Sequence, residues 1–106
     1  MAWVYLLTAG ALEIVATTLF RYTDGLSRIL PTVGFVAVAI ASLYCLNRSL
    51  AGVPLGTAYA VWTGIGAAGT AVLGIIAFGE AATAVRVALL FGLIACIVGL
   101  KFVSAQ

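Results

Sequence analysis

Four long apolar runs, separated by short polar segments, constrain the fold of this chain more than any other feature. The runs cover roughly residues 3–20, 32–49, 55–78 and 87–103, and a helix needs about 20 apolar residues to cross a bilayer. The links are about ten, four and eight residues long, too short to house a domain outside the membrane. We therefore predict an all-α membrane protein in which residues 1–106 form a single transmembrane domain, an up-down bundle of four helices.

The composition supports a membrane protein. Hydrophobic residues make up 65% of the chain and charged residues 8%, and the mean hydropathy is +1.29. Soluble domains, in contrast, are about half apolar and about a quarter charged. A cleavable signal peptide is the alternative interpretation of the first run, but the opening "MAWVYLLTAG" lacks the basic start that such peptides carry.

Several classes of function lack the residues that they need. The sequence has no histidine, the commonest metal ligand, and Cys45 and Cys96 both fall inside apolar runs. We therefore expect no metal site, no cofactor and no disulfide. The sequence shows no nucleophile–base pair of the kind that enzymes use, so we do not expect an enzyme. The five basic residues are scattered among short links, which gives no support for nucleic acid binding.

Basic residues near the ends of the runs give a weak signal for orientation. Four spans place both termini and the middle link on one side of the membrane, with Arg48 and Lys101, and leave Arg21, Arg28 and Arg86 on the other. A difference of two basic residues against three is a weak topology signal under the positive-inside rule. We therefore expect the chain to insert in both orientations and to form an antiparallel, dual-topology homodimer. A fixed topology set by other features is the alternative.

Glu13, in the stretch "GALEIVATT", is the one acidic residue deep within an apolar run. It follows Trp3 by ten residues, or roughly 15 Å of helix, which puts its carboxyl near the bilayer midplane. A charge at a helix centre costs about 2.5 to 3.5 kcal/mol on insertion scales and normally faces a bundle interior or a water-filled cavity. No basic residue lies at comparable depth, so the carboxylate is available to a proton or to a cation. Their competition for one charge is the minimum requirement of an exchanger, whereas a carboxyl that only hydrogen-bonds a neighbouring helix is the structural alternative.

Small residues surround Glu13 on its own helix. Gly10, Ala16 and Thr17 lie three or four positions away and therefore near its face. Because their side chains are small, we expect them to line a pocket that leaves room beside the carboxylate for a larger ligand.

The third run supplies aromatic residues for the same pocket. In "GTAYAVWTGIG", Tyr59 and Trp62 are three positions apart on one face, and Thr63 follows directly. Aromatic faces attract organic cations, and both side chains carry a hydrogen-bond donor. We assign Tyr59 and Trp62 to substrate binding and Thr63 to the pocket lining, with simple packing as the alternative. Ser42, in the second run, is a weaker polar candidate for orienting the carboxylate.

Glycines in the third and fourth runs suit helix contacts. Gly64 and Gly66 form a cluster that permits bending or close approach of a neighbouring helix, and Gly92 and Gly99 are seven positions apart on one face. We assign all four to helix bending or dimer packing.

Together, these residues resemble the small multidrug resistance transporters along the whole chain. The resemblance is carried by the glutamate at position 13, by "RYTDGLSRILPTVG" after the first run, by "VPLGTAYAVWTGIGA" in the third and by "GLK" near the end. It implies an antiparallel, dual-topology homodimer in the bacterial inner membrane that exports organic cations in exchange for protons. It also implies that Glu13 of both subunits is the shared proton and substrate site, with Tyr59 and Trp62 lining it and Ser42 close by.

The resemblance divides between two branches of that family. "YAVWTGIGA", Gly79-Glu80 and Gly99-Leu100-Lys101 look like the guanidinium exporters, which typically carry a tryptophan at the position of Ala16. "EIVATTLFRY" looks instead like the exporters of quaternary ammonium and aromatic drug cations.

Physical reasoning favours the quaternary ammonium branch. A guanidinium needs a tight, hydrogen-bonded shell, whereas a quaternary ammonium needs only charge and apolar surface. Alanine in place of tryptophan removes a wall from such a shell. We therefore predict a proton-coupled antiporter for small hydrophobic organic cations, chiefly quaternary ammonium compounds and also substituted guanidinium ions. The alternatives are a selective guanidinium/H⁺ exporter and, from another class, a passive dual-topology ion channel.

Overall fold

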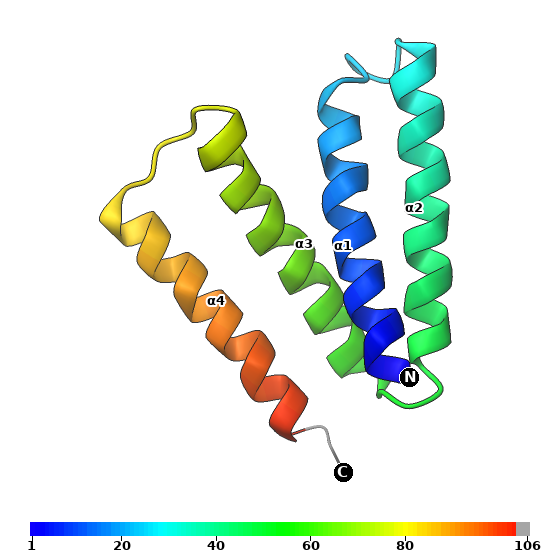
Figure 1. Cartoon of the computed structure of the whole chain (residues 1–106), viewed down its shortest axis with the longest axis vertical. Coiled ribbons are helices and arrows are strands. Elements are labelled where there is room, and N and C mark those ends of the chain that lie inside the picture. Colours follow the sequence, from blue (N-terminus) through cyan, green and yellow to red (C-terminus); the bar gives the residue numbers. More distant parts are fainter. Residues whose placement is uncertain (104–106) are drawn as a thin grey trace.

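A computed structural model describes residues 1–103, which form four helices connected up and down (Figure 1). Their bounds are α1 Ala2–Arg21, α2 Ile29–Ser49, α3 Leu55–Ala77 and α4 Ala84–Val103. Each is 20 to 23 residues long and apolar enough to cross a membrane. The prediction of an all-helical chain with four membrane-capable helices is therefore confirmed for the described residues.

Two helices begin three residues earlier than the apolar runs indicate. In α2, Ile29 precedes Pro31, which is tolerated because the N–H groups of a first helical turn have no partner in the helix. In α4, the hydroxyl oxygen of Thr83 accepts a hydrogen bond of 3.2 Å from the backbone N–H of Arg86. This is an N-cap, and it starts the helix at Ala84 and brings Arg86 into its first turn.

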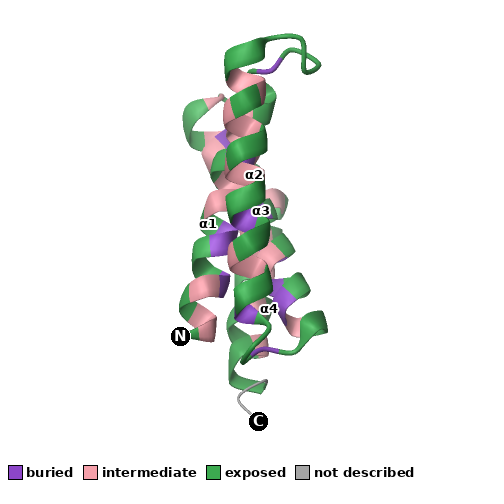
Figure 2. Cartoon of the chain, turned by 90° about the vertical axis from the view of Figure 1, so that its right-hand side faces the viewer, coloured by how far each residue is buried: buried purple, intermediate pink, exposed green. Residues whose placement is uncertain are grey.

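The helices form a layer rather than a closed bundle. In the described part of the chain, α1 packs against α2 and α3, whereas α4 packs against α3 alone; Figure 1 shows α3 and α4 splayed away from α1 and α2. The chain measures 44 × 35 × 17 Å, and a single helix with its side chains is already about 10–12 Å thick. Most residues in Figure 2 are exposed or half-buried, because no second layer covers them.

A small core holds the layer together at the end near the N-terminus. Leu6, Val53, Ala58 and Val61 are buried there, and Trp62 packs against them. The core therefore fixes the start of α3, which carries the aromatic residues of the site, against the first half of α1.

Candidate functional site

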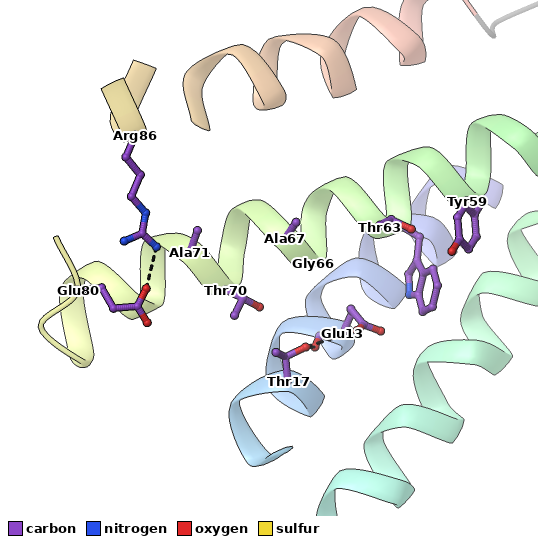
Figure 3. Close-up of a pocket in the computed structure, with 11 residues that line it drawn as sticks. Glu13, Thr17, Tyr59, Thr63, Gly66, Ala67, Thr70, Ala71, Glu80 and Arg86 are labelled. Carbon is purple, nitrogen blue, oxygen red and sulfur yellow. Dashed lines mark hydrogen bonds and ion pairs between the residues drawn. The ribbon is translucent and has the colours of Figure 1, made fainter. Parts of the chain in front are cut away.

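The site is a cavity of about 560 Å³ along one side of α3 (Figure 3). Its walls come from α1, from α3, and from the link between α3 and α4 together with the first turn of α4. The lining residues are Glu13, Thr17, Tyr59, Trp62, Thr63, Gly66, Ala67, Thr70, Ala71, Glu80 and Arg86.

Glu13 is half-buried where α1 lies close against α3. A Cβ placed on Gly66 would lie 2.5 Å from Glu13 Cγ, so only glycine lets the two helices meet this closely. The Thr17 hydroxyl donates a hydrogen bond of 2.9 Å to the Glu13 carbonyl oxygen and lies 3.4 Å from Glu13 Oε1. No basic side chain of residues 1–103 pairs with this carboxylate. Among the described residues, no ion pair therefore offsets its charge.

Trp62 is held in place by a chain of two hydrogen bonds. Its Nε1–H donates to Ser42 Oγ at 2.9 Å, and the Ser42 hydroxyl donates to the carbonyl oxygen of Ala9 at 2.7 Å. These bonds join α3 to α2 and α2 to α1. The ring of Tyr59 lies beside the indole, with 5.8 Å between centroids at an interplanar angle of 52°. The indole therefore enters the cavity at a fixed angle.

Three residues that the sequence assigned to the site do not line the cavity. Ser42 is fully buried, and it accepts a hydrogen bond from Trp62 and donates one to α1. Ala16 is 2% exposed, and Gly10 is buried where a Cβ would lie 2.6 Å from the Ile65 side chain. Helical spacing placed Gly10 and Ala16 near Glu13, but Ile65 of α3 covers Gly10, and Ala16 is buried on the other side of α1.

The four glycines assigned to bending or packing have different surroundings. Gly66 faces Glu13, and a Cβ on Gly64 would lie 2.9 Å from Ile97 of α4, so both allow close contacts within the chain. α3 runs unbroken through these positions. A Cβ on Gly92 or on Gly99 would meet no atom of the described residues within 4 Å, and both glycines lie on the exposed side of α4. Their assignment to dimer packing stays a prediction.

Sequence reasoning missed five lining residues: Ala67, Thr70, Ala71, Glu80 and Arg86. From the sequence, Arg86 counted only toward orientation and Glu80 only toward the family resemblance. The structure pairs them, with 2.7 Å between Arg86 Nη2 and Glu80 Oε1, and turns them toward the cavity. The one signal in the sequence was two opposite charges on either side of the short segment "AATAV".

The cavity suits a small organic cation. Carboxylate and hydroxyl oxygens along its wall accept hydrogen bonds, and the rings of Tyr59 and Trp62 present apolar faces that attract cations. Among residues 1–103, no group of three or more His, Cys, Asp or Glu side chains is placed to hold a metal ion.

Comparison with known proteins agrees with this chemistry. The Small Multidrug Resistance protein family matches residues 1–94. A protein of Proteus vulgaris named "Guanidinium exporter" is 45% identical over 104 residues, which is 98% of this chain and 100% of that protein. An Escherichia coli K12 protein of the same name is 46% identical over 101 residues, 95% of this chain and 96% of its own length.

The match extends over nearly the full length of these relatives, and it includes all four membrane-capable helices of the described residues. This chain is therefore a multi-pass membrane transport protein, and it belongs to the small multidrug resistance family.

Proposed function

We propose that the protein exports guanidinium ions, bare or carrying a small apolar substituent, across the bacterial inner membrane in exchange for protons. The observation that carries this proposal is the Glu13 carboxylate, which lies in a cavity between α1 and α3 without a basic partner in the described residues. A fixed ion pair would leave it no charge to offer. As it stands, it binds either a cation or a proton, and competition between the two couples their movements.

Guanidinium fits the cavity better than a quaternary ammonium ion does. Relatives at about 45% identity are named guanidinium exporters. The preference for quaternary ammonium ions depended on Ala16 as a missing wall, but Ala16 is buried and does not face the cavity. The hydroxyls of Thr17 and Thr63 along the wall are acceptors for N–H groups, which a quaternary ammonium ion lacks.

The size of the cavity supports substituted guanidinium ions as further substrates. At about 560 Å³ it exceeds the volume of a bare guanidinium several-fold. Ala67, Ala71 and the aromatic pair Tyr59 and Trp62 give an apolar substituent a surface to contact. A guanidinium group bound at Glu13 with its substituent along this surface would contact both the polar and the apolar part of the wall.

We further propose that the functional unit is an antiparallel, dual-topology homodimer. The layer is 17 Å thick, and α4 contributes no buried residue among the described positions, so most of its surface is available to a second copy. The near balance of basic residues on the two sides supports insertion in both orientations. Two copies of opposite orientation would enclose the Glu13 residues, and an exchange of conformation between them would open the site to either side, as inverted repeats do within single chains.

Transport by purified protein in liposomes tests the proposal. Liposomes loaded at one pH receive guanidinium, phenylguanidinium or tetramethylammonium, and cation uptake is recorded together with the internal pH. We expect both guanidinium ions to move with a stoichiometric proton flux in the opposite direction. Glu13→Gln should abolish the coupled movement, because the amide carries no charge for proton or cation.

Each other outcome excludes a specific interpretation. Guanidinium current without a proton flux would indicate a channel. Faster coupled transport of tetramethylammonium than of either guanidinium ion would restore the quaternary ammonium assignment. Unchanged coupled transport by Glu13→Gln would contradict the exchange mechanism itself.

A further inference from the structure

The link between α3 and α4 places a second carboxylate in the same cavity as Glu13. Glu80 Oε1 lies 2.7 Å from Arg86 Nη2, and Arg86 Nη1–H donates a hydrogen bond of 3.0 Å to the carbonyl oxygen of Ala81. The Glu80 side chain is 44% exposed and that of Arg86 34%, so this pair is accessible to water. Both residues line the cavity, at the end away from Tyr59 (Figure 3).

Glu13 and Glu80 lie against the same helix two turns apart. A Cβ on Gly66 would lie 2.5 Å from Glu13 Cγ, and a Cβ on Gly74 would lie 2.5 Å from Glu80 Oε2. Positions 66 and 74 are separated by roughly 12 Å along a helix axis. The backbone N–H of Glu80 also donates to the Gly74 carbonyl oxygen at 3.1 Å, which holds the start of the link against α3.

Thr70 lies midway between these glycines. It is four residues from each. It lines the main cavity, and it also lines a smaller neighbouring pocket to which Glu80 contributes. Its hydroxyl oxygen is buried and has no hydrogen-bond partner in the described part of the chain. Buried hydroxyls without a partner are unfavourable. A rotation of the Thr70 side chain toward the cavity would let an N–H donor of a passing ligand supply one.

The group that occupies Glu80 has the chemistry of the proposed cargo. The head of Arg86 is a guanidinium, a planar cation whose N–H groups match carboxylate oxygens. Ion pairs this exposed to water are weak, and their partners exchange readily. An arriving guanidinium ion carries the same chemical group as Arg86 and can therefore compete with it for Glu80.

We propose that Glu80 is an outer binding site for the guanidinium cargo, at which an arriving ion replaces the Arg86 side chain before it passes Thr70 to reach Glu13. The inference rests on the proposed function and extends it to a second acidic residue. In the proposed antiparallel dimer, one Glu80 lies toward each side of the membrane. Each side then has its own capture site for one shared inner site.

Variants of Glu80 and Arg86 separate this role from a structural one. If the ion pair only fixes the link, Glu80→Gln and Arg86→Gln break it equally and change transport in the same direction. An outer site predicts opposite directions. Losing the carboxylate should raise the KM for guanidinium by up to about fivefold, the equivalent of an exposed ion pair. Losing the competitor should lower KM, with the maximal rate unchanged in both.

Arg86→Lys is the matched control for the local field. Lysine keeps the positive charge but cannot reach both Glu80 and the Ala81 carbonyl with a planar fork. We expect its KM to fall between those of the wild-type protein and Arg86→Gln. If the KM of Arg86→Lys equals that of the wild type, the effect of Arg86→Gln comes from net charge alone. That result would contradict the replacement of Arg86 by the guanidinium cargo at Glu80. In Glu80→Gln/Arg86→Gln, the KM should equal that of Glu80→Gln, because no site remains for which arginine competes.

The measurements use guanidinium uptake in liposomes, with helix content by circular dichroism as the check on folding. If the wild-type protein does not move guanidinium, the proposed function fails. If the wild type moves it and Glu13→Gln does not, but Glu80→Gln and Arg86→Gln shift KM in the same direction or not at all, the outer site alone is wrong.

Discussion

At the scale of single residues, the position of the Glu13 carboxylate depends on what surrounds it. Gly66 provides the space for its side chain, and Thr17 hydrogen-bonds its backbone. Outside the cavity lining, Ser42 accepts a hydrogen bond from the Trp62 indole and so fixes its angle. None of these three neighbours brings a charge. In the proposed function, they determine where a cation meets the acid, and none of them offsets its negative charge.

We expect Gly66→Ala to weaken guanidinium transport. The added Cβ would lie 2.5 Å from Glu13 Cγ, so the acid or α1 must shift. Overpacking of this kind typically costs about 1–3 kcal/mol of folding stability. If about 1.4 kcal/mol of that strain is lost from cation binding, the KM rises about tenfold. Gly56→Ala is the matched control on the same helix, because nothing lies within 4 Å of its Cβ. Transport kinetics equal in the two variants would contradict the steric role of Gly66.

Ser42 should act on transport through Trp62. Ser42→Ala removes the acceptor of the indole N–H, a hydrogen bond that contributes about 1 kcal/mol, so cation affinity should fall about fivefold. In a Trp62→Phe background the same change should have an effect below about twofold, because the donor is already absent. Titration of bound cation by calorimetry for the four proteins gives the coupling. Additive losses would mean that Ser42 acts independently of the indole.

At the scale of helices, α4 differs from the other three. It packs against α3 alone in residues 1–103, and its exposed side carries Gly92, Cys96 and Gly99 at near-helical spacing. Rows of small residues allow helices in membranes to approach closely. The contact of α4 with α3, in contrast, is made where Ile97 reaches Gly64.

Substitutions on the two sides of α4 should therefore have different effects. A Cβ at position 92 or 99 would meet no atom of the described chain. Gly92→Leu and Gly99→Leu should therefore change helix content and the thermal midpoint little. The mass of the protein in detergent, measured by light scattering, should fall from that of a dimer to that of a monomer. Gly64→Leu should instead lower the thermal midpoint, because its Cβ would lie 2.9 Å from Ile97 Cδ1. A stable dimer of the double variant Gly92→Leu/Gly99→Leu would exclude this face as the interface.

The helices could be predicted from the sequence because a bilayer imposes a length of about 20 apolar residues on each. Glu13, Tyr59 and Trp62 could be predicted because charge and aromatic rings are conspicuous in such runs. The side of α1 that faces the cavity, and with it the role of the smaller residues, could not be predicted. Thr17 and Ala16 lie about 40° and about 60° from Glu13 on opposite sides of a helix, and only the placement of α2 and α3 decides which side is open.

Glu80 and Arg86 illustrate a second limit. Their contact depends on a link that folds back along α3 and on the Thr83 cap that starts α4 early. Neither feature has a periodic signal in the sequence. An ion pair across a short segment is visible only once the ends of both flanking helices are known.

At the scale of the whole molecule, orientation depends on a difference of one basic residue. Arg48 and Lys101 lie on one side of the four spans, and Arg21, Arg28 and Arg86 on the other. With so small a bias, single substitutions should decide the topology.

Two variants with opposite charge bias test dual topology. Arg28→Gln/Asn47→Lys changes the basic residues from two against three to three against two, and Arg48→Gln changes them to one against three. Glu13 remains intact in both. In cells, we expect each variant alone to insert mainly one way and to export poorly, and their co-expression to restore guanidinium export. Full export by each variant alone would contradict the antiparallel dimer.

The 17 Å thickness of the layer also bears on how the transporter is assembled. A newly inserted chain that has not yet met another copy has lipid on both faces, and the open side of its Glu13 cavity then borders acyl chains, which offer no hydrogen bonds. Association covers that opening. The residue that holds cargo in the proposed mechanism would thus disfavour single chains and favour their pairing.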